Sequence, residues 1–315
     1  MTTLYQVDRV SVWSLGRERE AKAWNFSWLF GIDATFGQGI YSRARQDGFA
    51  NKTMGTYPFA LVCPSTRGLS LALARRLLHS TNLPVYATYR SGSPQTVARD
   101  ILSPLRDVDE SRLNLIPLDL TREDSIAAAA RHLSDSLPRD REPYLHTAYI
   151  TGGMLHVEKQ PADLDAKIMQ QTFQINVISH LLLIKHFAHF LPKTQSITAD
   201  EGTLAKWVHI TARLGSITDN KRGGWYSYRA SKAALNQVIK TFDLQLQQRN
   251  SHAMCVGIHP GTVQTDLSKP FWNSIAQRSL FKPDFAAQRV VEVVEQLPPI
   301  ARGKVWDWSG KEIPP

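Results

Sequence analysis

Cysteine, long apolar runs and clustered basic residues are all scarce in this chain of 315 residues. The two cysteines are too few for a disulfide framework or a cysteine-rich zinc module. No stretch approaches the ~18 consecutive apolar residues of a membrane-spanning helix. The best candidate, residues 180–191, is interrupted by Lys185, His186 and His189. These absences predict a soluble protein of a reducing compartment, without stable membrane insertion.

Positive charge is in excess but dispersed. The 37 Lys and Arg outnumber the 28 Asp and Glu, which gives a formal net charge of +9. No run of five basic residues and no zinc-finger or RNP signature occurs, so we expect no nucleic-acid partner. A small anion such as a phosphate needs only two or three of these side chains.

The first part of the chain, residues 1–57, has no strand-like alternation and predicts a poorly structured N-terminal extension. Trp24 and Trp28 stand one helical turn apart, so docking on the rest of the chain or on a membrane surface stays open. Acidic residues in this part argue against a transit peptide, and it contains no secretory apolar region. We expect a cytoplasmic protein, with a mitochondrial location as the alternative.

From Tyr57 onward, short apolar runs alternate with segments of helical periodicity. The expected strands are 59–62, 85–88, 113–118, 145–150, 207–210, 254–258 and 305–308. The expected helices are 69–78, 125–137 (after a capping box at 121–124), 162–191, 226–250 and 285–297. This alternation predicts one α/β domain over 58–315, a doubly wound parallel sheet of the Rossmann type.

The first strand–helix turn, residues 63–70, has the form of a reduced phosphate-binding loop. Only Gly68 remains of its glycines, since Pro64 and Ser70 occupy the places of the others. The helix start still favours an anion, and Arg67 and Arg90 add positive charge there. Arg90 ends the second strand, where Arg favours a 2′-phosphate and hence NADP(H). A plain turn with solvated arginines is the alternative interpretation.

Tyr228 and Lys232 are four residues apart, so one face of a helix carries both side chains. A nearby ammonium favours the phenolate, and we therefore expect Lys232 to lower the pKa of Tyr228 and make it a proton donor and acceptor. Other reactive residue types offer less. We interpret Cys63 and Cys255 as buried thiols, His186 and His189 as residues of a helix surface, and we predict no metal site.

Several collinear motifs resemble the short-chain dehydrogenase/reductase family, in particular its C-factor-like and sniffer-like carbonyl reductases. The run Tyr-Ser-Tyr-Arg-Ala-Ser-Lys-Ala-Ala-Leu-Asn at 226–236 carries the resemblance, with supporting segments at 212–226, 259–271 and 305–314. The resemblance covers about residues 59–314. It implies a doubly wound fold, a nicotinamide cofactor, and a small-molecule carbonyl or alcohol substrate, and it leaves open whether the chain forms a homo-oligomer.

The resemblance also implies roles for individual residues. Tyr228 is the general acid and base, Lys232 lowers its pKa and holds the nicotinamide ribose, and Asn176 supports a proton-relay water. Residues 269–281 match the substrate lid. The implied NADP(H) contacts are Ser65, Arg67, Gly68, Leu69, Arg90, Asp119, Asn176, Tyr228, Lys232 and Val263.

Three departures from the family pattern stand against these roles. Ala212 replaces the serine that polarises the carbonyl, so Thr211, our choice, or Ser216 would have to supply the hydroxyl. The family's Asn-Asn-Ala-Gly turn becomes Ile-Thr-Gly-Gly at 150–153, and the glycine loop is reduced as described. A catalytically impaired scaffold or nucleotide sensor of the same fold is therefore the alternative to an NADP(H)-dependent oxidoreductase.

Overall fold

The structure is a computed structural model that describes residues 55–193, 203–274 and 276–315. The predicted extension, with Trp24 and Trp28, lies outside the described residues apart from its last positions. The described residues belong to one compact unit, Lys52–Pro315.

A central sheet of eight strands runs in the order β10-β9-β6-β5-β4-β1-β2-β3. Every neighbouring pair is parallel except β9 and β10, which are antiparallel. A short separate pair, β7 and β8, is also parallel. The strands are β1 (Thr56–Cys63), β2 (Val85–Tyr89), β3 (Leu113–Pro117), β4 (Glu142–Ile150), β5 (Ala205–Ile210), β6 (Ala253–His259), β7 (Thr262–Val263), β8 (Leu280–Phe281), β9 (Val305–Asp307) and β10 (Glu312–Ile313).

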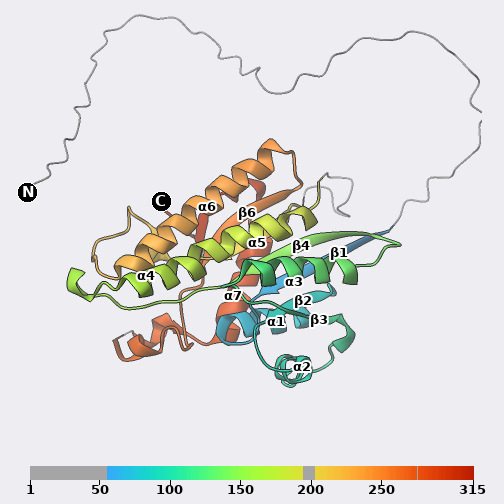
Figure 1. The fold of residues 1–315 in the computed structure, drawn as a ribbon, viewed down its shortest axis with the longest axis horizontal. Helices are drawn as coiled ribbons and strands as arrows, with labels where there is room; N and C mark the ends of the chain where they lie inside the picture. The colour runs from blue at the N-terminus through green and yellow to red at the C-terminus, as the bar shows by residue number, and fades with distance from the viewer. Residues whose placement is uncertain (1–54, 194–202, 275) are drawn as a thin grey trace, which may run out of the picture. The chain divides into compact units, whose positions relative to one another are not determined.

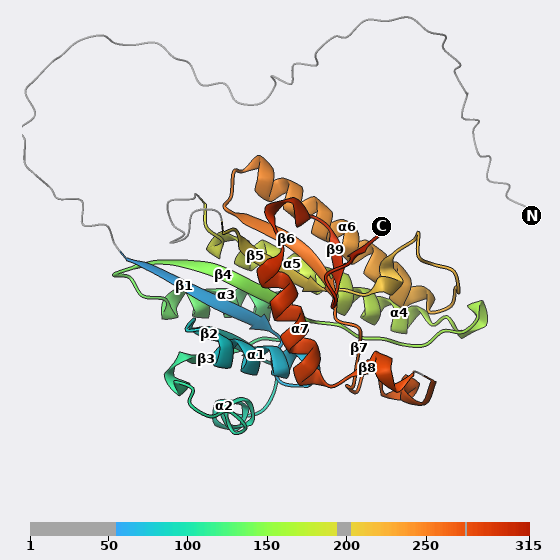
Figure 2. The same cartoon turned by 180° about the vertical axis from the view of Figure 1, so that it is seen from behind.

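Helices cover both faces of the sheet. Helices α5 and α6 lie in front of the strands in Figure 1, and α1 and α7 lie in front in the opposite view of Figure 2. The helices are α1 (Gly68–Ser80), α2 (Pro94–Leu102), α3 (Glu123–Ser136), α4 (Ala166–Phe173), α5 (Ser179–Phe187), α6 (Tyr226–Gln248) and α7 (Pro283–Gln296).

Alternation along the strands explains the two covered faces. In β1, Phe59 and Leu61 belong to the apolar core beneath α3, α5 and α6, while Ala60 and Val62 belong to the core beneath α1 and α7. Successive strand residues point to opposite faces, so a strand buried on both sides shows a continuous apolar run. The predicted doubly wound sheet is confirmed.

Two local expectations were wrong, and some elements were not predicted. The predicted capping box does not form, because α3 begins at Glu123 after Arg122, which makes no side-chain cap, and Thr121 bonds to Asp119 instead. The expected helix 162–191 is divided into α4, a π-helical segment (Gln174–Ile178) and α5. The antiparallel strand β10 has no counterpart in the predicted elements.

The order of the strands locates the binding region. The chain leaves β1 toward β2 and β3 on one side, whereas β4, on the other side of β1, continues toward β5 and β6. In open sheets of this kind ligands bind beyond the carboxyl ends of the strands at such a reversal. The loops after β1, β4, β5 and β6 therefore define the candidate site.

Candidate active site

Helix α6 brings Tyr228 and Lys232 into the interior at its N-terminal end. Their exposed fractions are 8% and 3%. The Lys232 Nζ atom donates to the Ile210 backbone carbonyl at the end of β5 over 3.1 Å and lies 5.9 Å from the centre of the Tyr228 ring. The helical spacing thus places a phenol and an ammonium beside each other at the carboxyl end of the sheet.

Burial moves both pKa values toward the neutral forms. Loss of water raises the pKa of Tyr228, which is opposite to the lowering expected from the sequence. The same cause lowers the pKa of Lys232 to about 8. Burial of the phenol is the cause of the raised pKa of Tyr228, and the lowering expected from the Lys232 ammonium is not found.

Asn176 lies in the π-helical segment between α4 and α5 and is fully buried. Its Nδ2 donates to Ser231 Oγ of α6 over 2.9 Å and to the Met154 carbonyl over 3.0 Å, and its Oδ1 accepts from the Met154 amide over 2.8 Å. Asn176 therefore ties the loop after β4 to the helix that carries Tyr228. Single π-helical turns are frequent at functional sites.

The small residues of the loop after β4 leave space beside these groups. A Cβ atom on Gly153 would stand 3.8 Å from Lys232 Nζ and 3.9 Å from Asn176 Oδ1. Just before it, the Thr151 hydroxyl lies 2.7 Å from the hydroxyl of Ser70 in α1 and bonds to the Pro64 carbonyl over 3.1 Å. Two departures from the family pattern are thus bonded to each other.

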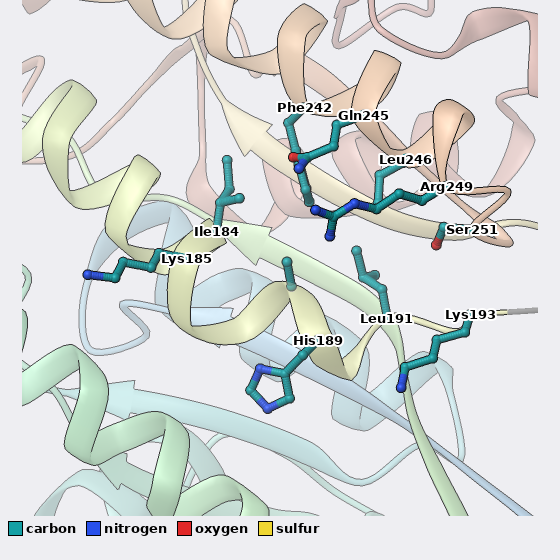
Figure 3. A pocket seen from close by; sticks show the side chains of 11 residues that line it. Ile184, Lys185, His189, Leu191, Lys193, Phe242, Gln245, Leu246, Arg249 and Ser251 are labelled. Atoms are coloured by element: carbon teal, nitrogen blue, oxygen red, sulfur yellow. The ribbon is translucent and has the colours of Figure 1, made fainter. Parts of the chain in front are cut away.

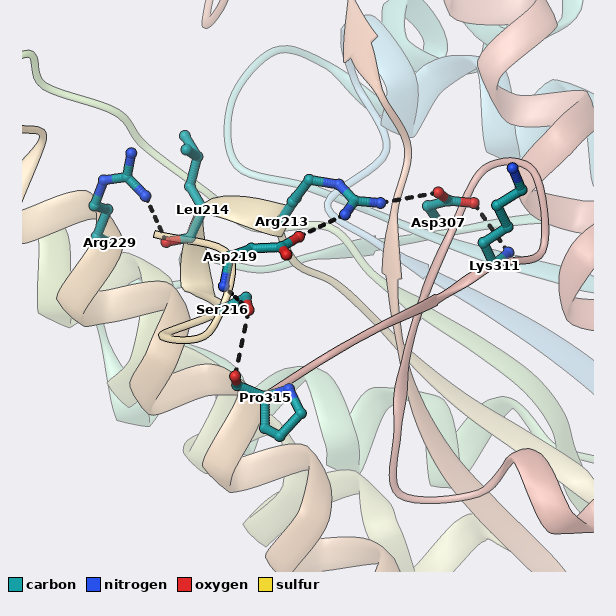
Figure 4. Close-up of polar contacts among 8 residues, drawn as sticks. All are labelled: Arg213, Leu214, Ser216, Asp219, Arg229, Asp307, Lys311 and Pro315. Atoms are coloured by element: carbon teal, nitrogen blue, oxygen red, sulfur yellow. Dashed lines mark hydrogen bonds and ion pairs between the residues drawn. The ribbon is translucent and has the colours of Figure 1, made fainter. Parts of the chain in front are cut away.

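The two candidate replacements for the missing serine are both engaged elsewhere. The Thr211 hydroxyl donates to Asn236 Oδ1 over 2.7 Å. The Ser216 hydroxyl lies 3.3 Å from the Pro315 carbonyl oxygen and accepts from the Asp219 amide, as Figure 4 shows. Ala212 itself is buried. Among the described residues, neither hydroxyl forms a hydrogen bond with Tyr228.

The predicted nucleotide end of the site carries exposed positive charge. Arg67 and Arg90 are exposed, and the charge of Arg90 helps the Thr121 amide to lower the pKa of Asp119. Helix α1 starts after Arg67 with no side-chain cap and no acidic residue in its first turn. The buried hydroxyl of Ser65 donates to the Thr88 carbonyl over 2.9 Å and fixes the turn.

These features fit the phosphates of a nicotinamide dinucleotide, because uncapped first-turn amides and two cations favour an anion. Gly68 has a φ of +55°, and a Cβ atom there would stand 2.7 Å from Thr265 Cγ2, so only glycine fits. Leu69, the next residue, is partly buried in the first turn of α1.

The predicted lid, residues 269–281, follows β7, which contains the buried Val263. The Ser268 hydroxyl donates to the Val263 carbonyl, and a 3-10 helix (Lys269–Ser274) follows. Its Phe271 ring packs 4.7 Å from the ring of Trp225, which in turn lies 6.3 Å from Tyr228, measured between centres. The candidate lid thus contacts the start of α6.

Sequence reasoning missed a buried chain of hydrogen bonds beside the site. Trp207 Nε1 donates to His209 Nε2 over 3.0 Å, the two Nδ1 atoms of His209 and His180 lie 2.8 Å apart, and His180 Nε2 lies 3.0 Å from the Gly152 carbonyl. Indole only donates, so His209 Nδ1 carries a proton and donates to His180, whose Nε2 donates to Gly152. The one sequence signal for this chain of bonds was the position of His180, one turn after Asn176 on the same helical face.

The structure also places the cysteines and the helix-surface histidine that the sequence singled out. Both cysteines are buried with raised thiol pKa values, to about 12 for Cys63. His186 bonds to Glu123 over 3.2 Å. The described residues contain no cluster of three potential metal ligands and no helix that is long and apolar enough to cross a bilayer.

A separate cavity of about 550 Å³ lies between α5 and the C-terminal end of α6. Figure 3 shows Arg249 and Gln245 projecting over apolar side chains such as Ile184 and Phe242. None of the predicted catalytic or cofactor residues lines it. The cavity is therefore distinct from the candidate active site.

The fold and the buried polar groups at the carboxyl end of its sheet define an α/β protein of the Rossmann type, and comparison with known proteins identifies its family. The short chain dehydrogenase family model matches residues 58–275, and the chain belongs to that family. C-signal of Myxococcus xanthus is 34% identical over 152 residues, which are 48% of this chain and 81% of C-signal. This similarity confirms the C-factor-like resemblance.

Two solved structures of the same fold are carbonyl reductases. An NADPH-bound carbonyl reductase from chicken fatty liver is 26% identical, with a TM-score of 0.69 over 82% of this chain and 99% of that one. The carbonyl reductase Sniffer of D. melanogaster has the same TM-score and coverage at 21% identity. At 21% identity, the similarity to Sniffer shows a shared fold.

Proposed function

We propose that the chain is an NADP(H)-dependent oxidoreductase that reduces a small-molecule carbonyl substrate, with Tyr228 as the proton donor. One observation carries this proposal. Tyr228, Lys232 and Asn176 are buried together at the carboxyl end of the sheet, where Asn176 is bonded to α6 through Ser231. Family membership and the NADPH-bound chicken carbonyl reductase support it.

The raised pKa of Tyr228 favours the neutral phenol, so at neutral pH this side chain is ready to give a proton to a carbonyl oxygen. Bound NADPH would supply the hydride to the carbonyl carbon. Lys232 has one acceptor in the structure, the Ile210 carbonyl, so its other ammonium protons suit the hydroxyls of a ribose. The space beside Gly153 suits the same ribose.

The preference for NADPH rests on Arg67 and Arg90. Both are exposed at the end of the site where a nucleotide phosphate would bind, and Asp119 beside Arg90 suits the adenine end.

The aromatic contact between Phe271 and Trp225 favours a bulky or aromatic carbonyl.

Titration with NADPH and NADH tests the cofactor. A charge-assisted contact contributes about 1.5–3 kcal/mol, so Arg90→Ala should weaken NADPH roughly ten- to a hundred-fold and leave NADH nearly unchanged. Arg99→Ala, an exposed arginine of α2, is the matched control. Failure to bind either nucleotide, or tighter binding of NADH, would contradict the assignment.

Turnover of a panel of carbonyl compounds tests Tyr228. Tyr228→Phe should abolish turnover and keep NADPH affinity, because only the hydroxyl is lost. Tyr226→Phe, an exposed tyrosine of the same helical turn, is the control and should leave kcat unchanged. Undiminished turnover by Tyr228→Phe would refute its role.

A nucleotide-binding scaffold or sensor is the second candidate. The observation that favours it is that Ala212 offers no hydroxyl while those of Thr211 and Ser216 are bonded elsewhere. This candidate predicts NADPH binding without turnover of any compound on the panel.

A further inference from the structure

Glu158 lies in the loop between β4 and α4 and is fully buried. Its carboxylate forms no ion pair within the described part of the chain. It bonds to Ser227 instead, accepting from the backbone amide over 2.8 Å and from the hydroxyl over 2.5 Å. Taking a carboxylate out of water is costly unless its oxygens are satisfied, so this arrangement calls for an explanation.

The start of α6 supplies that explanation. The first amides of a helix have no acceptor within the helix, and a side chain at the preceding position normally caps them. Here that position is Trp225, which makes no side-chain cap. Glu158, 69 residues earlier, takes over the role, and the positive end of a 23-residue helix compensates its charge.

The backbone before α6 is unusual as well. Gly223, Gly224 and Trp225 all have positive φ, of 64°, 65° and 53°. A residue with a Cβ atom loses roughly 1–2 kcal/mol in this conformation. The Trp225 amide donates to the Glu158 carbonyl over 2.7 Å, so one residue holds both the strained turn and the Ser227 amide in the first turn of the helix.

We propose that Glu158 is a positioning residue for Tyr228, fixing the first turn of α6 so that the phenol and the Trp225 ring keep their places in the site. This inference rests on the proposed function of Tyr228. It acts through geometry: burial alone accounts for the raised pKa of Tyr228, so Glu158 is not needed as a charge.

Three variants test the inference. Glu158→Ala removes both carboxylate bonds. Glu158→Gln keeps an acceptor for the Ser227 amide and offers a donor to its hydroxyl, so it should restore the wild-type behaviour. Ser227→Ala removes only the hydroxyl bond, which keeps the test decisive if Glu158→Ala does not fold. The control is Asp163→Ala, which removes a carboxylate that accepts from Lys159 and Gln160 amides in the same loop.

Hydrogen exchange gives a readout that needs no activity. In Glu158→Ala, amides 226–229 should exchange at least ten-fold faster, whereas amides 239–248 of the same helix should not change. Carbonyl reduction gives the second readout. kcat should fall ten- to a hundred-fold with substrate KM and NADPH affinity within about three-fold of wild type, and Ser227→Ala should show a smaller loss.

Each outcome decides the inference. Slower turnover confined to kcat, faster exchange at the start of α6, and recovery in Glu158→Gln support it. Unchanged exchange there, unchanged kcat, or an equal loss in Asp163→Ala overturns it. If the wild type reduces no compound on the panel, the proposed function fails, while the exchange data still decide whether Glu158 holds the first turn.

Discussion

Acidification should destabilise this protein sharply between pH 6.5 and 5, because His180 and His209 are buried as a neutral pair. No nitrogen of the pair can accept a further proton without breaking a bond. His180 Nδ1 faces the N–H of His209, and His209 Nε2 faces the N–H of Trp207. Burial accordingly lowers the pKa of His180 to about 3 and that of His209 well below its ordinary value of 6.5.

The sign and size follow from proton linkage. Above pH 6.5 both histidines are neutral in the folded and unfolded states, and stability does not depend on them. Below that pH only the unfolded chain takes up their protons, so stability falls by about 1.4 kcal/mol per pH unit for each histidine. At pH 5 the pair has cost about 4 kcal/mol, a large part of the ~5–15 kcal/mol that holds a typical domain together.

Urea unfolding at a series of pH values between 5 and 7.5 measures this effect. Between pH 5.5 and 5 the slope of unfolding free energy against pH should correspond to about two protons from this pair. His180→Gln should lower that slope by about one proton, whatever its effect on stability itself. His132→Gln, at an exposed position of α3, should leave the slope unchanged. A wild-type slope of less than one proton would refute a buried neutral pair.

Four further outcomes are expected. Ala212→Ser should raise kcat by at least ten-fold, measured with the best carbonyl substrate, because one oxyanion donor is typically worth 10²–10³ in rate. Rates that need the Lys232 ammonium should fall above about pH 8, and a pH–rate profile of kcat/KM checks this. Asp243→Ala should cost about 3–5 kcal/mol in urea unfolding, since this fully buried carboxylate pairs with Arg302. Gly68→Ala should weaken NADPH binding in the same titration assay, because its φ is +55°.

Much of the fold was predictable because it depends on patterns that local sequence carries. Apolar runs and helical periodicity located most elements of the sheet and its covering helices, and Tyr228 and Lys232 were visible through their spacing alone. β10 was not predictable, since two residues at an edge leave no periodic signal. The failed capping box at Thr121 shows a local competition, in which Asp119 captured the threonine hydroxyl.

The contacts that define the site environment were out of reach for a different reason. Glu158 is bonded to Ser227, which lies 69 positions later in the sequence, and His180 is bonded to His209, which lies 29 positions later. Such pairs are set by which strands become neighbours, and no local pattern marks them. The direction of the Tyr228 pKa failed likewise, because spacing shows that Lys232 is near but not how completely the phenol is enclosed.

The departures from the family pattern do not count equally against catalysis. The hydroxyls of Ser70 and Thr151 are bonded to each other, so the changes in these two loops compensate each other. Gly153 still leaves space beside Lys232. In the part of the chain that the structure describes, no such compensation is found for Ala212, because the hydroxyls of Thr211 and Ser216 are bonded to other groups. Loss of one oxyanion donor typically costs 10²–10³ in rate, while Tyr228, the proposed proton donor, and the Lys232 ammonium remain in place. We therefore expect a slow reductase, whose rate is limited by the missing hydroxyl rather than by failure to bind its cofactor.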